Sequence, residues 1–173
     1  AAEFWGMGSY GTVGANKNSI KIIGHATELH CQAYFVYDSK KSGGLTQSHL
    51  RFGREPIRSP YLVRSADFIA CHTPSYVKKY DVAENLRPGG IFLLNCTWSD
   101  DELEQQLPAK LRRTLAQKHA QFYTINATAI ARKLGLGSRT NTILQAAFFS
   151  LSAVIPVEQA VEEMKKAIYD TYY

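Results

Sequence analysis

Residues 4–18 read FWGMGSYGTVGANKN, and this stretch decides the fold. Its glycines have the spacing of a turn that joins a strand to a helix, where backbone N–H groups close around a phosphate. The apolar residues before the glycines and the helix-like run after them supply part of the context such a turn needs. The positive end of that helix would face the same anion. The candidate phosphate ligands of this loop are Gly8, Ser9, Gly11 and Thr12.

Strand-like and helix-like segments alternate along the rest of the chain. Short apolar or alternating runs predict strands at residues 31–37, 45–52, 66–71, 91–95 and 121–126. Helical periodicity, caps and prolines predict helices at residues 12–24, 74–86, 99–107, 108–118, 127–134, 140–153 and from Pro156 onward, with a turn at 87–90. This alternation predicts an α/β fold: one three-layer α/β/α domain, residues 1–173, with a mostly parallel sheet and a Rossmann-like glycine-loop start.

Composition narrows the class of protein. The net charge is +5, but the basic residues form no dense stripe interleaved with aromatic residues. We therefore do not expect a nucleic-acid partner. No apolar run approaches the roughly 20 residues of a membrane-spanning helix, so we expect no membrane association. The three cysteines, Cys31, Cys71 and Cys96, form no CxxC pair. They predict free thiols in a reducing, cytoplasmic setting and no metal site in this chain.

Further polar and basic residues follow other expected strands or precede helices. In a sheet of this kind ligands bind at the carboxyl ends of the strands, so these residues predict one pocket for a phosphorylated ligand. They are Lys40, Lys41, Ser42, Asn95, Arg139 and Asn141. A nicotinamide site is an alternative, with Asp38 as the ribose carboxylate, although the adjacent lysines favour an additional phosphate. A third interpretation is that Lys40 and Lys41 lie in a solvated loop that binds no ligand. No residue of the chain is predicted to be catalytic.

The glycine stretch in its full length is more specific than a glycine triplet. Together with YFVYDSKKSGG at 34–44, SHLRFG at 48–53, GIFLLN at 90–95, LGLGSRTN at 134–141 and QAAFF at 145–149, it resembles pyruvate:ferredoxin (flavodoxin) oxidoreductase. The matching part is the gamma-type domain, the third domain of the single-chain enzymes and a separate subunit in some 2-oxoacid oxidoreductases. The resemblance covers essentially the whole chain.

The resemblance implies a role within a larger enzyme. In this family pyruvate is decarboxylated on thiamine diphosphate, electrons pass through iron–sulfur clusters to ferredoxin or flavodoxin, and the acetyl group goes to coenzyme A. The gamma domain is associated with coenzyme A, which assigns the ten candidate residues above to that ligand. It also implies contacts with the other domains of a homodimeric parent.

The chain itself shows neither a cysteine-rich ferredoxin-like segment nor a thiamine diphosphate site. We therefore expect a domain cut from the single-chain enzyme and inactive alone. The alternatives are a free-standing gamma subunit, a purely structural packing domain and an NADP-binding domain.

Overall fold

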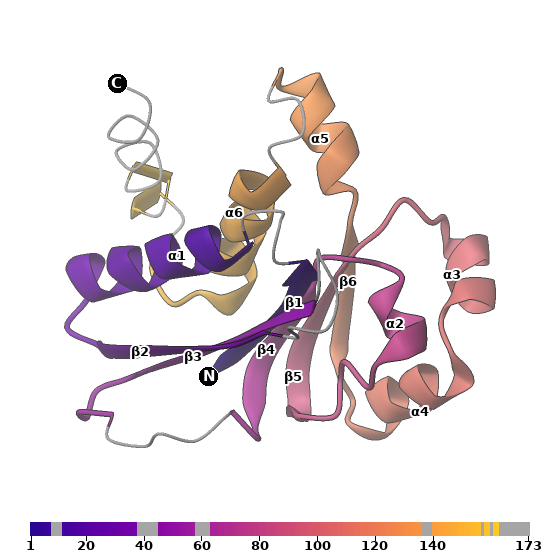
Figure 1. Cartoon of the computed structure of the whole chain (residues 1–173), viewed down its shortest axis with the longest axis horizontal. Helices are drawn as coiled ribbons and strands as arrows, with labels where there is room; N and C mark the ends of the chain where they lie inside the picture. The colour runs from indigo at the N-terminus through magenta and orange to yellow at the C-terminus, as the bar shows by residue number, and fades with distance from the viewer. Residues whose placement is uncertain are drawn as a thin grey trace.

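A six-stranded sheet forms the centre of the molecule, with strand order β2-β3-β1-β4-β5-β6 (Figure 1). The computed structural model describes residues 1–7, 12–37, 45–57, 63–135, 140–156, 158–159 and 161–162. The strands are β1 (Ala2–Met7), β2 (His30–Tyr37), β3 (Leu45–Gly53), β4 (Ala66–Cys71), β5 (Leu86–Asn95) and β6 (Gln121–Ile125). The helices are α1 (Thr12–Ala26), α2 (Tyr76–Lys79), α3 (Asp100–Gln106), α4 (Ala109–Gln117), α5 (Ala127–Lys133) and α6 (Thr140–Ser152).

Most of the sheet is parallel. β1 pairs in parallel with β4, β4 with β5, and β5 with β6, whereas β3 runs antiparallel to both β1 and β2. The α/β class and the mostly parallel sheet predicted from the sequence are thus confirmed. The position of β3 between β2 and β1 was not predicted.

Helices cover both faces of the sheet, and each face has its own core. On one face, here called the α1 face, Phe4, Phe68 and Leu93 pack with side chains of α1 and α6. On the opposite face, the α2 face, Trp5 and Phe92 pack with side chains of α2 and α4. The alternation of side chains along each strand separates the two sets. The three predicted layers are present in the described residues, as Figure 1 shows.

The strand order creates a topological switch point between β1 and β4. The helix after β1 is α1, which lies on the α1 face, whereas the helix after β4 is α2, which lies on the opposite face. Connections that leave neighbouring strands toward opposite faces open a crevice at their carboxyl ends. The carboxyl end of β1 is therefore the expected place for a ligand site in this fold.

The structure confirms the predicted start of one helix and shows that the predictions for two other segments are wrong. Ser99 accepts a hydrogen bond from the Glu102 N–H, and the Ser99 N–H donates to the Glu102 carboxylate, each at 3.3 Å, so a capping box begins the helix predicted at 99–107. The helix predicted at 74–86 is wrong beyond the single turn of α2. The turn predicted at 87–90 is a bulge inside β5, because Leu86 pairs with Ala66 while Ile91 already pairs with Phe68.

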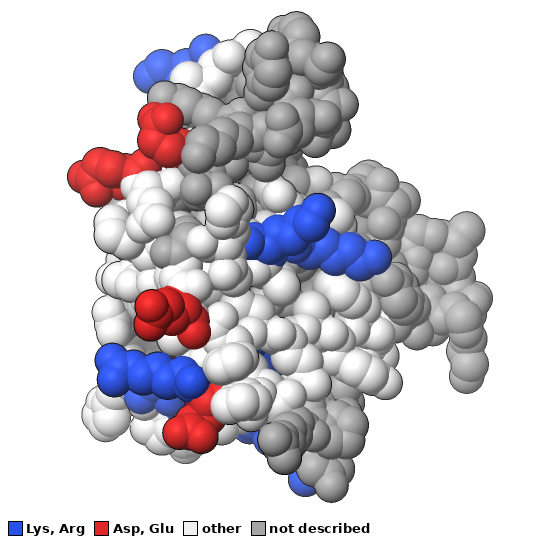
Figure 2. Space-filling model, turned by 90° about the vertical axis from the view of Figure 1, so that its left-hand side faces the viewer, with Lys and Arg blue, Asp and Glu red and all other residues white. Residues whose placement is uncertain are grey.

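Charged side chains do not form a stripe on the side that bears β2. Among the described residues visible there, the charged side chains form small groups, one of them of mixed sign, on a largely uncharged surface (Figure 2). No helix in the described part of the chain is long and apolar enough to cross a membrane.

Candidate functional site

The two phosphate-suited segments leave the sheet from neighbouring strand ends. β1 ends at Met7, just before the glycine loop, and Met7 pairs with Leu45, the first residue of β3. Tyr37, the last residue of β2, pairs with Thr46 of the same strand. The residues that flank 8–11 and 38–44 are therefore in contact through the sheet. Both segments begin at the edge of the sheet that contains the switch point.

Most of the predicted ligand residues lie in segments outside the described residues. These are Gly8, Ser9, Gly11, Lys40, Lys41, Ser42 and Arg139. Thr12 is the first residue of α1, although its side chain is outside the described part. Asn95 ends β5 and Asn141 is the second residue of α6. The participation of all ten residues in ligand binding stays a prediction.

Asn95 has a structural task at this edge. Its amide nitrogen donates to the backbone carbonyl of His72 at 3.1 Å, and its amide oxygen accepts from the N–H of Ala127, also at 3.1 Å. One side chain thus links the end of β5 to the segment after β4 and to the first residue of α5. A ligand that bound the Asn95 amide would compete with these contacts.

Replacing Asn95 by alanine should destabilise the domain by roughly 1–3 kcal/mol, because two partly buried backbone groups lose their partners. Thermal or urea unfolding of the variant measures this cost. Asn95→Asp is the informative comparison, since its carboxylate still accepts from Ala127 N–H but cannot donate to the His72 carbonyl. An Asn95→Ala variant as stable as the parent chain would contradict the linking role.

His72 lies at the carboxyl end of β4, directly at the switch point. Its ring contacts Phe4 edge-on at a centroid distance of 5.8 Å, which places it on the α1 face. Cys71 belongs to the core on the α2 face, so these adjacent residues point to opposite sides of the sheet, as neighbours in an extended strand do. Burial lowers the pKa of His72 to about 4, so the imidazole is neutral at pH 7. Both ring nitrogens are buried and lack a hydrogen-bond partner within the described structure.

Sequence reasoning missed a group of buried polar side chains on the same face. Thr46 pairs with Gly6 and Ser48 with Phe4, so both hydroxyl groups lie on the α1 face beside β1. Other members come from the helices that cover this face. Asn16 of α1, Thr46, Ser48 and Gln145 of α6 each have a buried polar atom without a hydrogen-bond partner among the described residues.

Buried polar atoms in folded proteins are nearly always satisfied by protein, water or ligand. The group under α1 and α6 therefore marks a polar region beside the carboxyl end of β1. The sequence contains a pattern that could have predicted buried polar residues in α1. Asn16 and Ser19 precede Ile23 by seven and four residues, the spacing of one helix face, and both are indeed buried.

The cysteines are free, as predicted, although Cys31 is only half-buried. Burial raises the pKa of the Cys71 thiol to about 12, which keeps it protonated and a poor metal ligand. In the parts of the chain that the structure describes, no three His, Cys, Asp or Glu side chains are placed to hold a metal ion.

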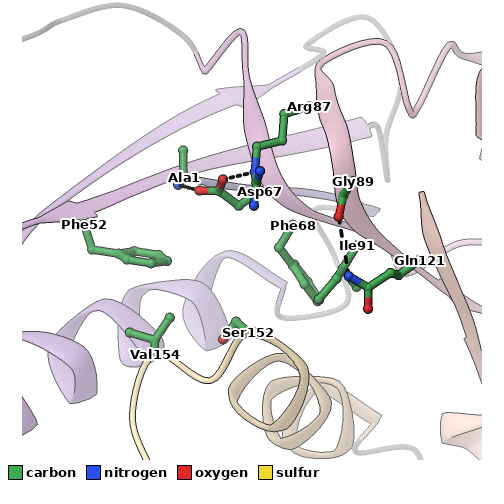
Figure 3. A pocket seen from close by; sticks show the side chains of 10 residues that line it. All are labelled: Ala1, Phe52, Asp67, Phe68, Arg87, Gly89, Ile91, Gln121, Ser152 and Val154. Carbon is green, nitrogen blue, oxygen red and sulfur yellow. Dashed lines mark hydrogen bonds and ion pairs between the residues drawn. The ribbon is translucent and has the colours of Figure 1, made fainter. Parts of the chain in front are cut away.

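A separate hollow lies at the opposite edge of the sheet, beside the amino ends of β4 and β5 (Figure 3). It has a volume of about 280 Å³, with Phe52, Phe68 and Val154 on its apolar wall. An ion pair between Asp67 and Arg87 borders it. Ligands of open α/β sheets bind at the carboxyl edge, so this hollow is not the candidate phosphate site.

Comparison of the sequence with known proteins finds relatives that match nearly the whole chain. The family model described as pyruvate ferredoxin/flavodoxin oxidoreductase matches residues 2–172. A pyruvate-flavodoxin oxidoreductase from Klebsiella pneumoniae is 60% identical over 172 residues, which are 99% of this chain and 15% of that protein. The chain thus spans about a seventh of the length of this relative.

Two solved structures share the fold at low sequence identity. The crystal structure of a pyruvate oxidoreductase subunit from Thermotoga maritima matches with a TM-score of 0.75 and 17% identity, covering 99% of this chain and 84% of that one. A 2-oxoglutarate:ferredoxin oxidoreductase from Magnetococcus marinus matches with a TM-score of 0.63 and 14% identity, covering 95% of this chain and 29% of that one. From the family match and the long stretch of 60% identity, this chain belongs to the pyruvate ferredoxin/flavodoxin oxidoreductase family.

Proposed function

We propose that this chain is the gamma-type domain of an enzyme that converts pyruvate and coenzyme A to acetyl-CoA and carbon dioxide, passing two electrons to ferredoxin or flavodoxin. Within that enzyme the domain binds coenzyme A at the carboxyl edge of its sheet. The observation that carries this proposal is the pairing of Met7 with Leu45, which brings together the residues that flank the glycine segment and the lysine segment.

The chemistry of both segments suits coenzyme A. The ligand carries a diphosphate and a 3′-phosphate, which need separate sets of donors. The glycine segment precedes the 15-residue helix α1, whose N-terminus favours an anion, and Lys40 and Lys41 offer charges for a second phosphate. The solved structure of the Magnetococcus marinus 2-oxoglutarate:ferredoxin oxidoreductase, which shares this fold, has coenzyme A and succinyl-CoA bound, and this supports coenzyme A as the ligand.

Redox chemistry belongs to other parts of the enzyme in this proposal. Thiamine diphosphate supplies the decarboxylation and iron–sulfur clusters carry the electrons. The described cysteines do not fit a cluster, since Cys71 and Cys96 are buried in the core of the α2 face and Cys31 lies on the other face. The isolated domain should therefore not oxidise pyruvate. Free thiols suit a cytoplasmic enzyme.

Replacing Lys40 and Lys41 together by alanine should raise the apparent KM for coenzyme A by roughly tenfold or more in the complete enzyme, because charge-assisted phosphate contacts are lost. Steady-state kinetics with varied coenzyme A measures the effect. Lys78→Ala with Lys79→Ala is the matched control, since it removes an adjacent exposed lysine pair from α2 instead.

An unchanged KM for coenzyme A in the Lys40 and Lys41 variant would remove these lysines from the site. If the same variant instead lowered the stability of the enzyme without a selective effect on coenzyme A, the packing-domain alternative would replace the proposal.

A further inference from the structure

Helix α5 buries small apolar side chains and exposes large ones, which is the opposite of the usual arrangement. It buries two alanines, Ala127 and Ala131, which are fully shielded from solvent. Its larger apolar side chains point outward: Ile130 is 37% exposed, and Leu134, the C-cap residue, is 63% exposed. A helix on the surface of a globular domain normally buries its large apolar residues and exposes the small and polar ones. Ile130 and Leu134 are four residues apart, so they form one stripe, here called the α5 stripe.

The α5 stripe lies on a firmly held element. Asn95 accepts from the N–H of Ala127 at 3.1 Å, and Asn126 caps the helix by accepting from the N–H of Ala129 at 3.0 Å. These two bonds hold the first turn of α5, and in its last turn the Leu134 N–H donates to the carbonyl of Ile130 at 3.0 Å, so both members of the stripe lie on formed helix. Figure 1 shows α5 standing beyond the carboxyl end of β6, away from the bulk of the sheet. β6 is the edge strand that leads into α5, and its Tyr123 is 40% exposed.

Two observations indicate what covers the stripe. In the Klebsiella pneumoniae relative the matched residues make up 15% of the polypeptide, so most of that protein is available to pack against this domain. Arg132 and Lys133 are exposed in the last turn of α5, next to both members of the stripe. A partner surface must then be apolar where it meets Ile130 and Leu134 and acidic around that contact.

We propose that the α5 stripe docks into an apolar groove, bordered by carboxylates, on another domain of the same oxidoreductase polypeptide. Asn95 connects α5 to the segment after β4, so the docked domain would sit beside the switch point. The switch point would then be bordered by two domains. The contact itself is independent of which ligand binds there.

Hydroxyl-radical footprinting of the complete oxidoreductase tests this contact without altering the protein. Side chains at the centre of an interface are desolvated, so Leu134 should be oxidised about tenfold more slowly than a freely exposed leucine. Tyr34, which is 50% exposed on the opposite edge strand, serves as the internal reference for an accessible side chain. Oxidation of Leu134 at the rate expected for its exposure in this chain would overturn the proposal.

A pair of charge variants gives a second readout. Leu134→Glu in the complete enzyme should lower its melting temperature by several degrees and expose the domain to limited proteolysis, since a carboxylate would enter an apolar, acid-bordered groove. Ala129→Glu adds the same charge at an exposed position of the same helix outside the stripe and should change neither. Equal behaviour of the two variants would contradict the docking.

The partner is identified by cross-linking. With Leu134→Cys in the complete enzyme, a short cysteine-to-amine cross-linker should join α5 to another domain within one polypeptide. A disulfide between two copies of α5 would show instead that a second copy covers the stripe, and the proposal would be wrong. These outcomes do not depend on the KM for coenzyme A, so they are separable from the test of the ligand site.

Discussion

Replacing Glu3 by glutamine should raise the free energy of unfolding at pH 8 by up to roughly 3 kcal/mol and leave it nearly unchanged at pH 4. Glu3 lies in β1 and is fully buried. Burial raises the pKa of its carboxyl from 4.5 to about 7, and a hydrogen bond of 3.1 Å from the Asn85 amide opposes that shift only in part. Glutamine keeps the shape and an acceptor for Asn85 without a charge to bury.

The sign of the pH dependence follows from proton binding. Between pH 4.5 and 7 the unfolded chain has released the Glu3 proton while the folded chain still holds it. The stability contributed by the neutral carboxyl is therefore complete below about pH 4.5 and is lost as the pH rises through 7. Urea unfolding at several pH values across this window measures the slope.

One other titratable group, His49, lies beside Glu3, and an exposed glutamate elsewhere provides the control for this experiment. His49 is directly opposite Glu3 in the β1–β3 pairing, and burial lowers the pKa of its imidazole. Its Nδ1 accepts from the Val63 N–H at 3.2 Å, which leaves the proton of the neutral ring on Nε2. Glu104→Gln, at an exposed position of α3, is the matched control and should keep the slope of the parent chain. A Glu3→Gln variant with an unaltered slope would contradict the burial of a titrating carboxyl.

Replacing Phe148 by alanine should cost about 3–5 kcal/mol of stability, a large share of the 5–15 kcal/mol of a typical domain. Phe148 is 1% exposed, and its ring lies 5.2 Å from the ring of Phe4 and 5.2 Å from that of Phe68, measured between centroids. It fixes α6 against the sheet, and the same helix carries Gln145 and Asn141. The loss should therefore also weaken ligand binding at the carboxyl edge.

Tyr34→Ala is the control for this second substitution, because it removes an aromatic ring that is half exposed on the edge strand β2. It should cost less than about 1 kcal/mol. Thermal unfolding compares the two variants. A loss below about 1 kcal/mol for Phe148→Ala would mean that α6 does not pack on the sheet as described.

The two proposals together describe a domain that contributes one half of a ligand site. The flanks of the glycine and lysine segments meet at the carboxyl edge, and α5 is held beside the same edge by Asn95. If a second domain docks on the α5 stripe, the ligand would be enclosed by residues of both. This arrangement gives a physical reason for a site whose chemistry is incomplete in the described part of this chain.

The sequence by itself determined the features that depend on neighbouring residues. β4 was predicted with the same bounds, residues 66–71, because a nearly continuous apolar run of that length is typical of a strand buried on both faces. The start of the helix at 99 was predicted because the two hydrogen bonds of its capping box join residues only three apart, Ser99 and Glu102. The alternation of strands and helices, and with it the fold class, followed from the same local signals.

Only the tertiary structure decided the features that depend on residues far apart in the chain. It inserted β3 between β2 and β1, it turned the expected turn at 87–90 into a bulge opposite β4, and it buried the carboxyl of Glu3. It also gave Asn95 two backbone partners and left Leu134 exposed. Periodicity shows which side chains share a face, but burial depends on what packs against that face, and that is set by contacts across the whole sheet.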